Sequence, residues 1–279
     1  MAGVITASEP SWTAPFTGLS PRAFGKLVTV PRREGADAVR KGRPRSLPLE
    51  DQALLVAAYW RTNLTMRQLA PLFGVSKSAA DRIIDHLGPM LALQPRRRFA
   101  KDTVLIADGT LVPTHDHTVA ERSKNYRYST NHQVVIDADT RLVVVAGRPL
   151  AGNRNDCKAW EESGAKATVG KTLTIADGGY PGTGLVIPHR RERGQSELPD
   201  RKEEHHTSHK QVRARIEHTF ARMKTWKILR NCRLKSDGVH HTMPGIARMH
   251  HLALARQTSR PYDGPPHPKQ LEEHLRDSP

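Results

Sequence analysis

Cysteine is scarce in this chain of 279 residues, which contains only Cys157 and Cys232. Two cysteines are too few for a disulfide framework or for a zinc module built on cysteine ligands. The sequence also has no apolar run of transmembrane length and no N-terminal signal with a charged start and an apolar centre. We therefore expect no membrane partner and a reducing, cytoplasmic setting.

Acidic residues are few relative to basic ones: 28 Asp and Glu against 44 Lys and Arg, for a formal charge of +16. A surplus of this size indicates a polyanionic partner, usually nucleic acid. The basic residues recur along the whole chain, which disfavours an anionic membrane as that partner. Charge alone leaves two classes equally open, a DNA enzyme and a soluble protein that is merely basic.

Residues 1–47 are expected to carry a short helix and a basic linker. The first dozen residues contain Ser, Thr, Pro and Gly without a pattern, so they are expected to be poorly ordered. Ser20-Pro21 is typical of a helix start. The stretch from Pro31 to Pro48 is either a solvated linker or an arm that lies along phosphates.

Residues 48–98 have a helical period and are expected to form a helix-turn-helix. Ala70 supplies the small residue where two helices cross, and Gly74 supplies a turn residue that tolerates positive φ. Ser76 can cap the second helix, while Pro71 fits only a short first helix that begins near Met66. An ordinary helical hairpin is the alternative. DNA binding is favoured because the small residue, the turn glycine and the apolar positions fall in register.

Several residues of this module are candidates for contact with bases and phosphates in the major groove. The outward positions of the second helix are Lys77, Ser78, Asp81, Arg82 and Asp85. Three consecutive arginines follow at a predicted hinge, Arg96, Arg97 and Arg98.

Residues 99–258 have a strand-rich pattern that predicts an α/β domain. Two helices are expected at Asp156–Ser163 and from about Gln211 to Leu229, with a long polar loop from Thr183 to Ser208. Residues 259–279 are expected to be a disordered tail. The predicted strands are Thr103–Ala107, Gln133–Ile136, Leu142–Ala146 and Leu173–Ala176, with a hairpin turn at Asp137–Thr140.

Three carboxylates in this domain suggest a site for hard divalent cations. Asp108 and Asp177 each end a short apolar run and are each followed by glycine, and Glu217 lies on the predicted late helix. Arg213, Glu217 and Lys224 fall on one face of that helix. Taken singly, each aspartate could be a turn residue and Glu217 an ordinary salt-bridge partner. Two-metal phosphoryl chemistry needs such carboxylates to converge from different elements.

The chain resembles the DDE-type insertion-sequence transposases, in the bacterial group related to the PIF/Harbinger elements. The resemblance extends from about Leu54 to Leu254. The motifs that match the family are Ile106-Ala107-Asp108-Gly109-Thr110, Ile175-Ala176-Asp177-Gly178-Gly179-Tyr180, Asn153-Arg154-Asn155-Asp156 and Arg213-x3-Glu217-x6-Lys224. One position departs from the family signature, because Lys210 stands where the family has Tyr.

The resemblance implies an RNase H-like catalytic domain, with a mixed central sheet flanked by helices, behind an all-α helix-turn-helix module. It implies two Mg²⁺ (or Mn²⁺) ions held by Asp108, Asp177 and Glu217, whose carboxyl groups should converge within roughly 4–8 Å. It also implies cleavage of double-stranded DNA at the terminal inverted repeats, followed by attack of the 3′-OH ends on target DNA.

The helical spacing suggests roles for two basic residues: Arg213 could orient Glu217 or bind a phosphate, and Lys224 could bind a DNA phosphate or base. A homodimer or higher oligomer is expected in the synaptic complex, and the protein is expected to be associated with the nucleoid. Two other functions stay open, a transposase-derived DNA-binding regulator and a metal-dependent nuclease without strand transfer.

Two histidine clusters have spacings similar to those of metal ligands. They are His115-Asp116-His117 and His205-His206-Thr207-Ser208-His209. Because no cysteine lies near either cluster, zinc is disfavoured and both are expected in polar loops.

Overall fold

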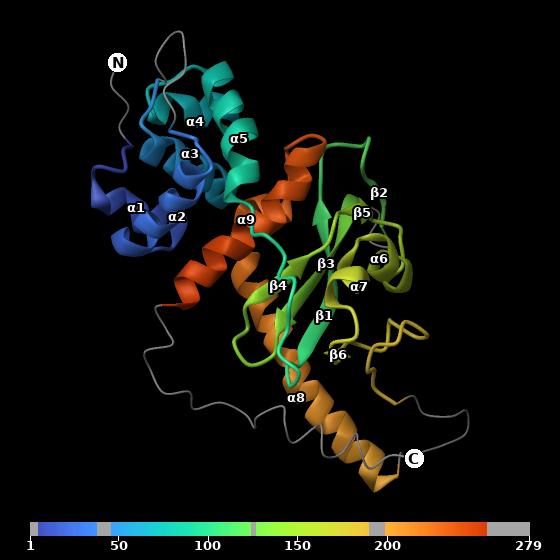
Figure 1. The fold of residues 1–279 in the computed structure, drawn as a ribbon. Coiled ribbons are helices and arrows are strands. Elements are labelled where there is room, and N and C mark those ends of the chain that lie inside the picture. The colour runs from blue at the N-terminus through green and yellow to red at the C-terminus, as the bar shows by residue number, and fades with distance from the viewer. Residues whose placement is uncertain (1–4, 38–45, 124–126, 190–198, 256–279) are drawn as a thin grey trace. The chain divides into compact units, whose positions relative to one another are not determined.

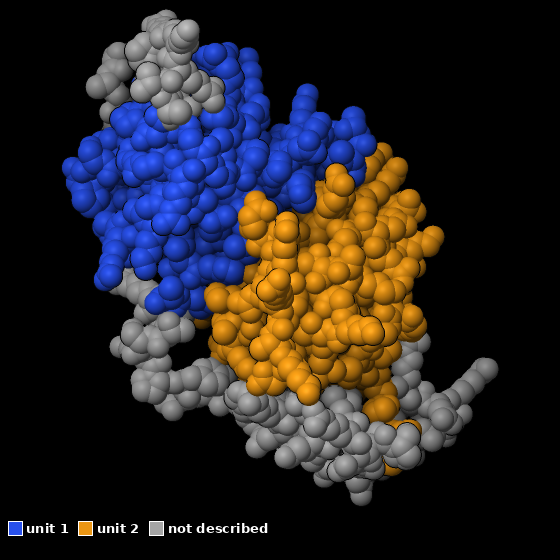
Figure 2. Space-filling view, viewed as in Figure 1, with its two compact units in different colours: residues 1–93, 112–119, 223–260 blue, residues 94–111, 120–222, 261–279 orange. Residues whose placement is uncertain are grey.

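The computed structural model describes residues 5–37, 46–123, 127–189 and 199–255. The chain forms two compact units that are discontinuous in sequence (Figure 2). Unit 1 comprises residues 1–93, 112–119 and 223–260; unit 2 comprises residues 94–111, 120–222 and 261–279. The expected tail at 259–279 lies outside the described residues, as does the linker segment 38–45.

Unit 1 is helical. Its central helix is α3, whose residues from Leu54 to Trp60 are all buried. Figure 1 shows its elements, which are η1 (Pro10–Trp12), α1 (Thr13–Thr17), α2 (Pro21–Arg33), α3 (Leu49–Thr62), α4 (Met66–Leu72), α5 (Lys77–Leu91), η2 (Lys227–Arg230) and α9 (Asp237–Leu254).

The prediction that the first dozen residues are poorly ordered is wrong from Ile5 onward. Ile5 is buried, and the backbone N of Ala7 donates to Oδ1 of Asp51, 2.6 Å away. This tertiary contact with α3 leaves no periodic signal in the sequence. The predicted helix start at Ser20 is confirmed, because its side chain accepts from the backbone N of Ala23. The predicted linker start at Pro31 is wrong, since Pro31 is buried within α2.

The helix-turn-helix has the predicted local geometry. Helix α4 begins at Met66, and the turn passes through Gly74, whose φ of 64° lies in the left-handed region that favours glycine. The side chain of Ser76 accepts a hydrogen bond from the backbone N of Ala79 and caps α5. Ala70 on α4 and Ala80 on α5 are both buried.

Unit 2 is built on one mixed sheet with the order β2-β3-β1-β6, in which β4 and β5 also pair with β3. Strands β1 and β6 are parallel, whereas β2, β4 and β5 are antiparallel to β3. The predicted α/β class with a mixed sheet flanked by helices is confirmed. The strands are β1 (Leu105–Pro113), β2 (Glu121–Arg122), β3 (Tyr128–Asp137), β4 (Val143–Ala146), β5 (Leu150–Ala151) and β6 (Thr174–Ile175).

Helices cover both faces of this sheet. On one face, Leu105, Ala107 and Val135 share a buried cluster with residues of α6 (Asp156–Glu162) and α7 (Ala165–Val169). Because side chains alternate along a strand, the neighbouring buried residues Ile106 and Ile136 face the opposite side. Helix α8 (Asp200–Met223) covers that side (Figure 1).

Both predicted boundaries of the late helix in unit 2 are wrong. Helix α8 begins at Asp200, inside the stretch predicted as loop. The prediction missed its first turns because they are polar and carry no apolar stripe. The helix ends at Met223 rather than Leu229, since the chain turns there and Trp226 and Leu229 are buried in unit 1. The predicted hairpin turn is confirmed: Oδ1 of Asp137 accepts from the backbone N of Asp139 and Thr140.

Candidate active site

Parallel pairing of β1 with β6 brings Asp108 and Asp177 side by side. Leu105 pairs with Thr174 and Ile106 pairs with Ile175. The same register places Asp177, two residues beyond the end of β6, opposite Asp108. Neighbouring strands lie about 4.8 Å apart, so the two aspartates occupy adjacent positions. The backbone N of Gly109 donates to Oδ1 of Asp108, and that of Gly179 donates to Oδ1 of Asp177, both at 2.8 Å.

The position of Asp108 differs from the prediction in one respect. The strand was expected to end at Ala107, but β1 continues to Pro113, so Asp108 and Gly109 lie inside it. A glycine after an apolar run is typical of a strand end, and here it has another cause. A β-carbon at Gly109 would lie 2.7 Å from Oδ1 of Asp156 and from Nε2 of Gln133, so the position has no room for a side chain.

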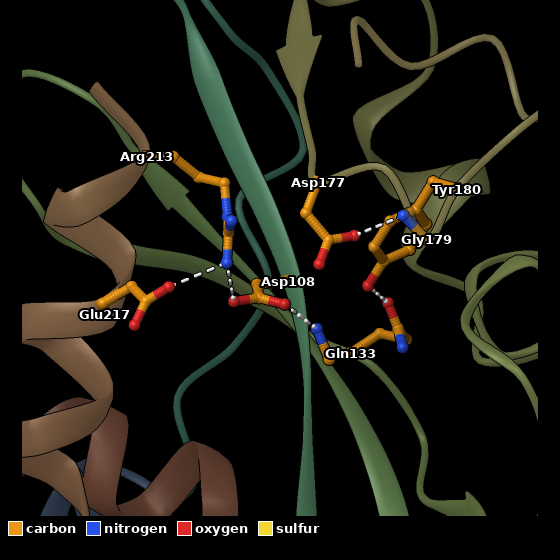
Figure 3. A network of polar contacts seen from close by, with 8 residues as sticks. Asp108, Gln133, Asp177, Gly179, Tyr180, Arg213 and Glu217 are labelled. Carbon is orange, nitrogen blue, oxygen red and sulfur yellow. Dashed lines mark hydrogen bonds and ion pairs between the residues drawn. The ribbon is translucent and has the colours of Figure 1, made fainter. Parts of the chain in front are cut away.

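Helix α8 supplies the third carboxylate and a cation. The predicted apolar stripe is confirmed, because Val212, Ile216, Phe220 and Met223 are all buried. Burial of this stripe turns the adjoining face toward Asp108. Nη2 of Arg213 donates to Oε1 of Glu217 at 2.8 Å and lies 3.6 Å from Oδ2 of Asp108. Figure 3 shows the guanidinium between the two carboxylates, with Asp177 on the far side of Asp108.

The site carries an excess of negative charge. Burial raises the pKa of Asp108 to about 6, the nearby Arg213 opposes this shift, and the charges of Asp177 and Glu217 add to it. A single guanidinium therefore does not neutralise the three carboxylates. Oxygen donors of this kind are the ligands that Mg²⁺ prefers, so the residue types fit a hard cation. Among the described residues, no three His, Cys, Asp or Glu side chains are already grouped as metal ligands.

The other candidate DNA contacts lie at the surface, with one exception. Lys77, Ser78 and Arg82 are exposed on α5. Arg96, Arg97 and Arg98 are exposed in the segment before β1, and Nη1 of Arg96 lies 3.4 Å from Oδ2 of Asp137. Lys224 is half-buried and follows the end of α8, so it is not on the helix that carries Glu217.

Residues of both histidine clusters contact other parts of the chain, and Nε2 of His209 lies 3.3 Å from the backbone O of Val186. Nε2 of His115 lies 2.8 Å from Oδ1 of Asn231, and Oδ1 of Asp116 accepts from the hydroxyl of Thr118. The second cluster was expected in a loop but lies within α8, where His206 is exposed and His209 is buried.

A buried polar network beside the aspartates was not predicted. The hydroxyl of Tyr180 donates to Oε1 of Gln133 at 2.8 Å, and Nε2 of Gln133 donates to Oδ1 of Asn131 at 3.1 Å. Nδ2 of Asn131 donates to Oδ1 of Asp156 at 3.3 Å. The run Ser129–Gln133 is buried in β3 although its side chains are polar, and a polar run gives no apolar signal for a buried strand. Sequence reasoning began this strand only at Gln133.

Two family models match this chain. The model described as "Transposase DDE domain" matches residues 99–252, which include all three carboxylates. The chain belongs to the DDE transposase family. A second model, "Helix-turn-helix of DDE superfamily endonuclease", matches residues 45–96 of this family member. The predicted DDE resemblance is thereby confirmed; the closer relation to PIF/Harbinger elements stays a prediction.

Two relatives belong to insertion sequences. The DDE family member is 91% identical over 254 residues to the transposase assigned to element IS112 of Streptomyces albus G, covering 91% of this chain and 99% of the relative. It is 24% identical over 235 residues to the transposase assigned to element IS702 of Microchaete diplosiphon, covering 77% and 84% of the two chains. No solved structure gives a significant match.

Family membership supports three conclusions, on the fold, on the general function and on DNA binding. The DDE domain implies an RNase H-like fold for the mixed sheet and its helices. The relatives support a transposase function, and the helix-turn-helix match supports DNA binding. Within the described part of the chain, no helix is both long and apolar enough to cross a membrane.

Proposed function

We propose that this protein is a transposase that binds the terminal inverted repeats of its insertion sequence, cleaves there and joins the 3′-OH ends to target DNA. Asp108, Asp177 and Glu217 are its catalytic residues. The observation that carries the proposal is the register of β1 and β6, which sets the two aspartates side by side while α8 adds Glu217.

The three carboxylates would hold two Mg²⁺ or Mn²⁺ ions, as DDE enzymes generally use divalent metals. Such ions supply charge neutralisation at the phosphodiester and an activated oxygen nucleophile. The raised pKa of Asp108 supports this role, because its burial among like charges leaves the site short of positive charge. Before metal binds, Arg213 supplies part of that charge through its contacts with Asp108 and Glu217.

Arg213 also suits a second task. Its side chain is 26% exposed, so its guanidinium can bind a DNA phosphate when a cation takes over the carboxylates. In this proposal Arg213 thus moves from the carboxylates to the substrate.

DNA binding is divided between the two matched regions. Lys77, Ser78 and Arg82 on α5 contact the inverted repeat in the major groove. Arg96, Arg97, Arg98 and Lys224 contact phosphates, which strengthens binding without reading sequence. Joining two element ends calls for at least two protomers, so a homodimer or a higher oligomer forms the synapse. The division into residues 48–98 for end binding and 99–258 for catalysis belongs to the proposal.

The test is an end-joining assay with purified protein, Mg²⁺, a labelled element end and a target plasmid. Asp177→Ala should abolish cleavage and joining, whereas Glu161→Ala, at an exposed carboxylate of α6 in the same unit, should not. Cleavage without joined products would favour a nuclease. DNA binding with no cleavage, unaffected by Mg²⁺ and by Asp177→Ala, would favour a DNA-binding regulator and refute the proposal.

A further inference from the structure

Asp156, the first residue of α6, lies against both glycines that accompany the aspartates. A β-carbon at Gly109 would lie 2.7 Å from its Oδ1, and a β-carbon at Gly179 would lie 3.4 Å from its Oδ2. The carboxylate of Asp156 therefore lies beside both the strand that carries Asp108 and the turn that carries Asp177.

The carboxylate of Asp156 is held in place by the buried network on β3. Its Oδ1 accepts from Asn131, Asn131 accepts from Gln133, and Gln133 accepts from the hydroxyl of Tyr180. Asn131, Gln133 and Tyr180 are at most 4% exposed. The chain of contacts returns to Tyr180, next to Gly179, so Asp156 and the turn after β6 are tied to the same strand.

Asp156 lies across β1 from the carboxylate of Asp108. Side chains alternate along a strand, so Asp108 faces α8, where Arg213 contacts it. The direction in which Gly109 would carry a side chain therefore faces α6. This placement suits an effect of Asp156 through the backbone of the site, rather than a direct share in its chemistry.

We propose that Asp156 is a positioning residue, whose carboxylate between Gly109 and Gly179 sets the separation of the segments that carry Asp108 and Asp177. Its effect on catalysis rests on the proposed function, whereas its effect on these two segments does not. The size and shape of the carboxylate should matter more than its charge, because it lies against Gly109 and Gly179 and accepts a hydrogen bond from the amide of Asn131.

Two substitutions separate size from charge. Asp156→Asn keeps the shape and the acceptor for Asn131 but removes the charge. Asp156→Glu keeps the charge, and keeps an acid in the first turn of α6 where it favours the helix, but adds a methylene against Gly109. A positioning role predicts that Asp156→Asn leaves the site unchanged and that Asp156→Glu disturbs it. A helix-stabilising or metal-binding role predicts the reverse order. Lys158→Ala, at an exposed site in the same turn, is the control.

The first readout is amide hydrogen exchange of peptides spanning residues 105–111 and 174–180 in the full chain without DNA. Asp156→Glu should speed exchange in both peptides by about tenfold or more, as local opening becomes easier, while Asp156→Asn and Lys158→Ala match the wild type. Unchanged exchange in Asp156→Glu, or faster exchange in Asp156→Asn than in Asp156→Glu, would overturn the proposal. Should Asp156→Glu fail to fold while Asp156→Asn folds normally, size is again the property that matters.

The second readout is the rate of end cleavage at saturating DNA and Mg²⁺. A displacement near 1 Å costs about 10²-fold in rate, so Asp156→Glu should lose about that much in kcat with KM for DNA unchanged. Asp156→Asn should stay within about tenfold of the wild type. If the wild type does not cleave DNA, the proposed function fails while the exchange result still decides the role of Asp156. If exchange responds but cleavage by Asp156→Glu is normal, positioning for catalysis is refuted.

Discussion

Arg213 donates from Nη2 to Oε1 of Glu217 at 2.8 Å, one helical turn away on α8. The same nitrogen lies 3.6 Å from Oδ2 of Asp108 on β1. The guanidinium therefore acts as an internal counter-ion for two of the three carboxylates. It does not restore the ordinary pKa of Asp108, because burial chiefly raises that pKa to about 6 and the charges of Asp177 and Glu217 add to the shift. The predictions that follow depend on this balance of charge and on the packing around it.

Asp108→Asn should stabilise the metal-free protein. It removes a buried charge that is repelled by Asp177 and Glu217. A shift from 3.8 to about 6 sets an upper limit of roughly 3 kcal/mol on the gain in unfolding free energy at pH 7. Urea unfolding in EDTA measures it, with Glu162→Gln, at an exposed carboxylate of α6, as the control that changes stability by less than about 0.5 kcal/mol. A loss of stability in Asp108→Asn would contradict the charge argument.

The gain from Asp108→Asn should also depend on pH. Below about pH 4 the carboxyl group is protonated in both the folded and the unfolded wild type, so the two proteins differ little. As pH rises from 4 to 6, the unfolded chain ionises first and the wild type loses stability relative to the variant. Above pH 6 the difference in unfolding free energy between the two proteins reaches its full value. Unfolding curves of both proteins at pH 4 and pH 7 measure it, and an equal difference at the two values would refute the assignment to Asp108.

Mg²⁺ should raise the melting temperature of the wild type, because a cation relieves the repulsion among the carboxylates. At a concentration of 100 times Kd, the stabilisation is about 2.7 kcal/mol. Asp177→Asn should remove most of the shift, while Glu161→Gln should leave it intact. The comparison is a thermal melt with and without EDTA. If Asp177→Asn responds to Mg²⁺ as the wild type does, Asp177 is not a metal ligand.

Arg82→Ala should weaken binding to the inverted repeat by about 1–3 kcal/mol, because its exposed side chain on α5 can reach bases or phosphates. Fluorescence anisotropy with a labelled duplex at several salt concentrations measures the effect. The matched control is Asp81→Ala at the neighbouring exposed position, where loss of a negative charge should not weaken binding. Equal losses for the two variants would exclude this face of α5 from the DNA interface.

Gly109→Ala should damage the site, whereas Gly178→Ala should not. A β-carbon at Gly109 meets Asp156 and Gln133 at 2.7 Å, and one at Gly178 meets nothing within 4 Å. Overpacking of this kind costs about 1–3 kcal/mol, and either the strand that carries Asp108 or the side chains of Asp156 and Gln133 must shift. Melting temperatures and cleavage rates of the two variants provide the comparison. A Gly109→Ala enzyme with normal activity would show that the contacts around Gly109 do not set the site.

Much of the local structure could be predicted from the sequence, because its signals are local. Gly74, Ser76 and the helix start at Met66 act within one turn of chain, and all three are observed. The apolar stripe from Val212 to Met223 likewise follows from helical periodicity. The first turns of α8 are polar and gave no such signal, so the helix was predicted to begin 11 residues too late.

The sequence by itself determined the basic charge, the helix-turn-helix and the identity of three acidic residues in family-like motifs. The tertiary structure decided which of these residues meet. The register of β1 with β6 sets Asp177 opposite Asp108, and burial of one face of α8 turns Arg213 toward Asp108. The tertiary structure also decided that Gly109 lies inside a strand, where Asp156 occupies the space that a side chain would need. These contacts join residues 47 to 105 positions apart, and packing between elements, not local propensity, brings them together.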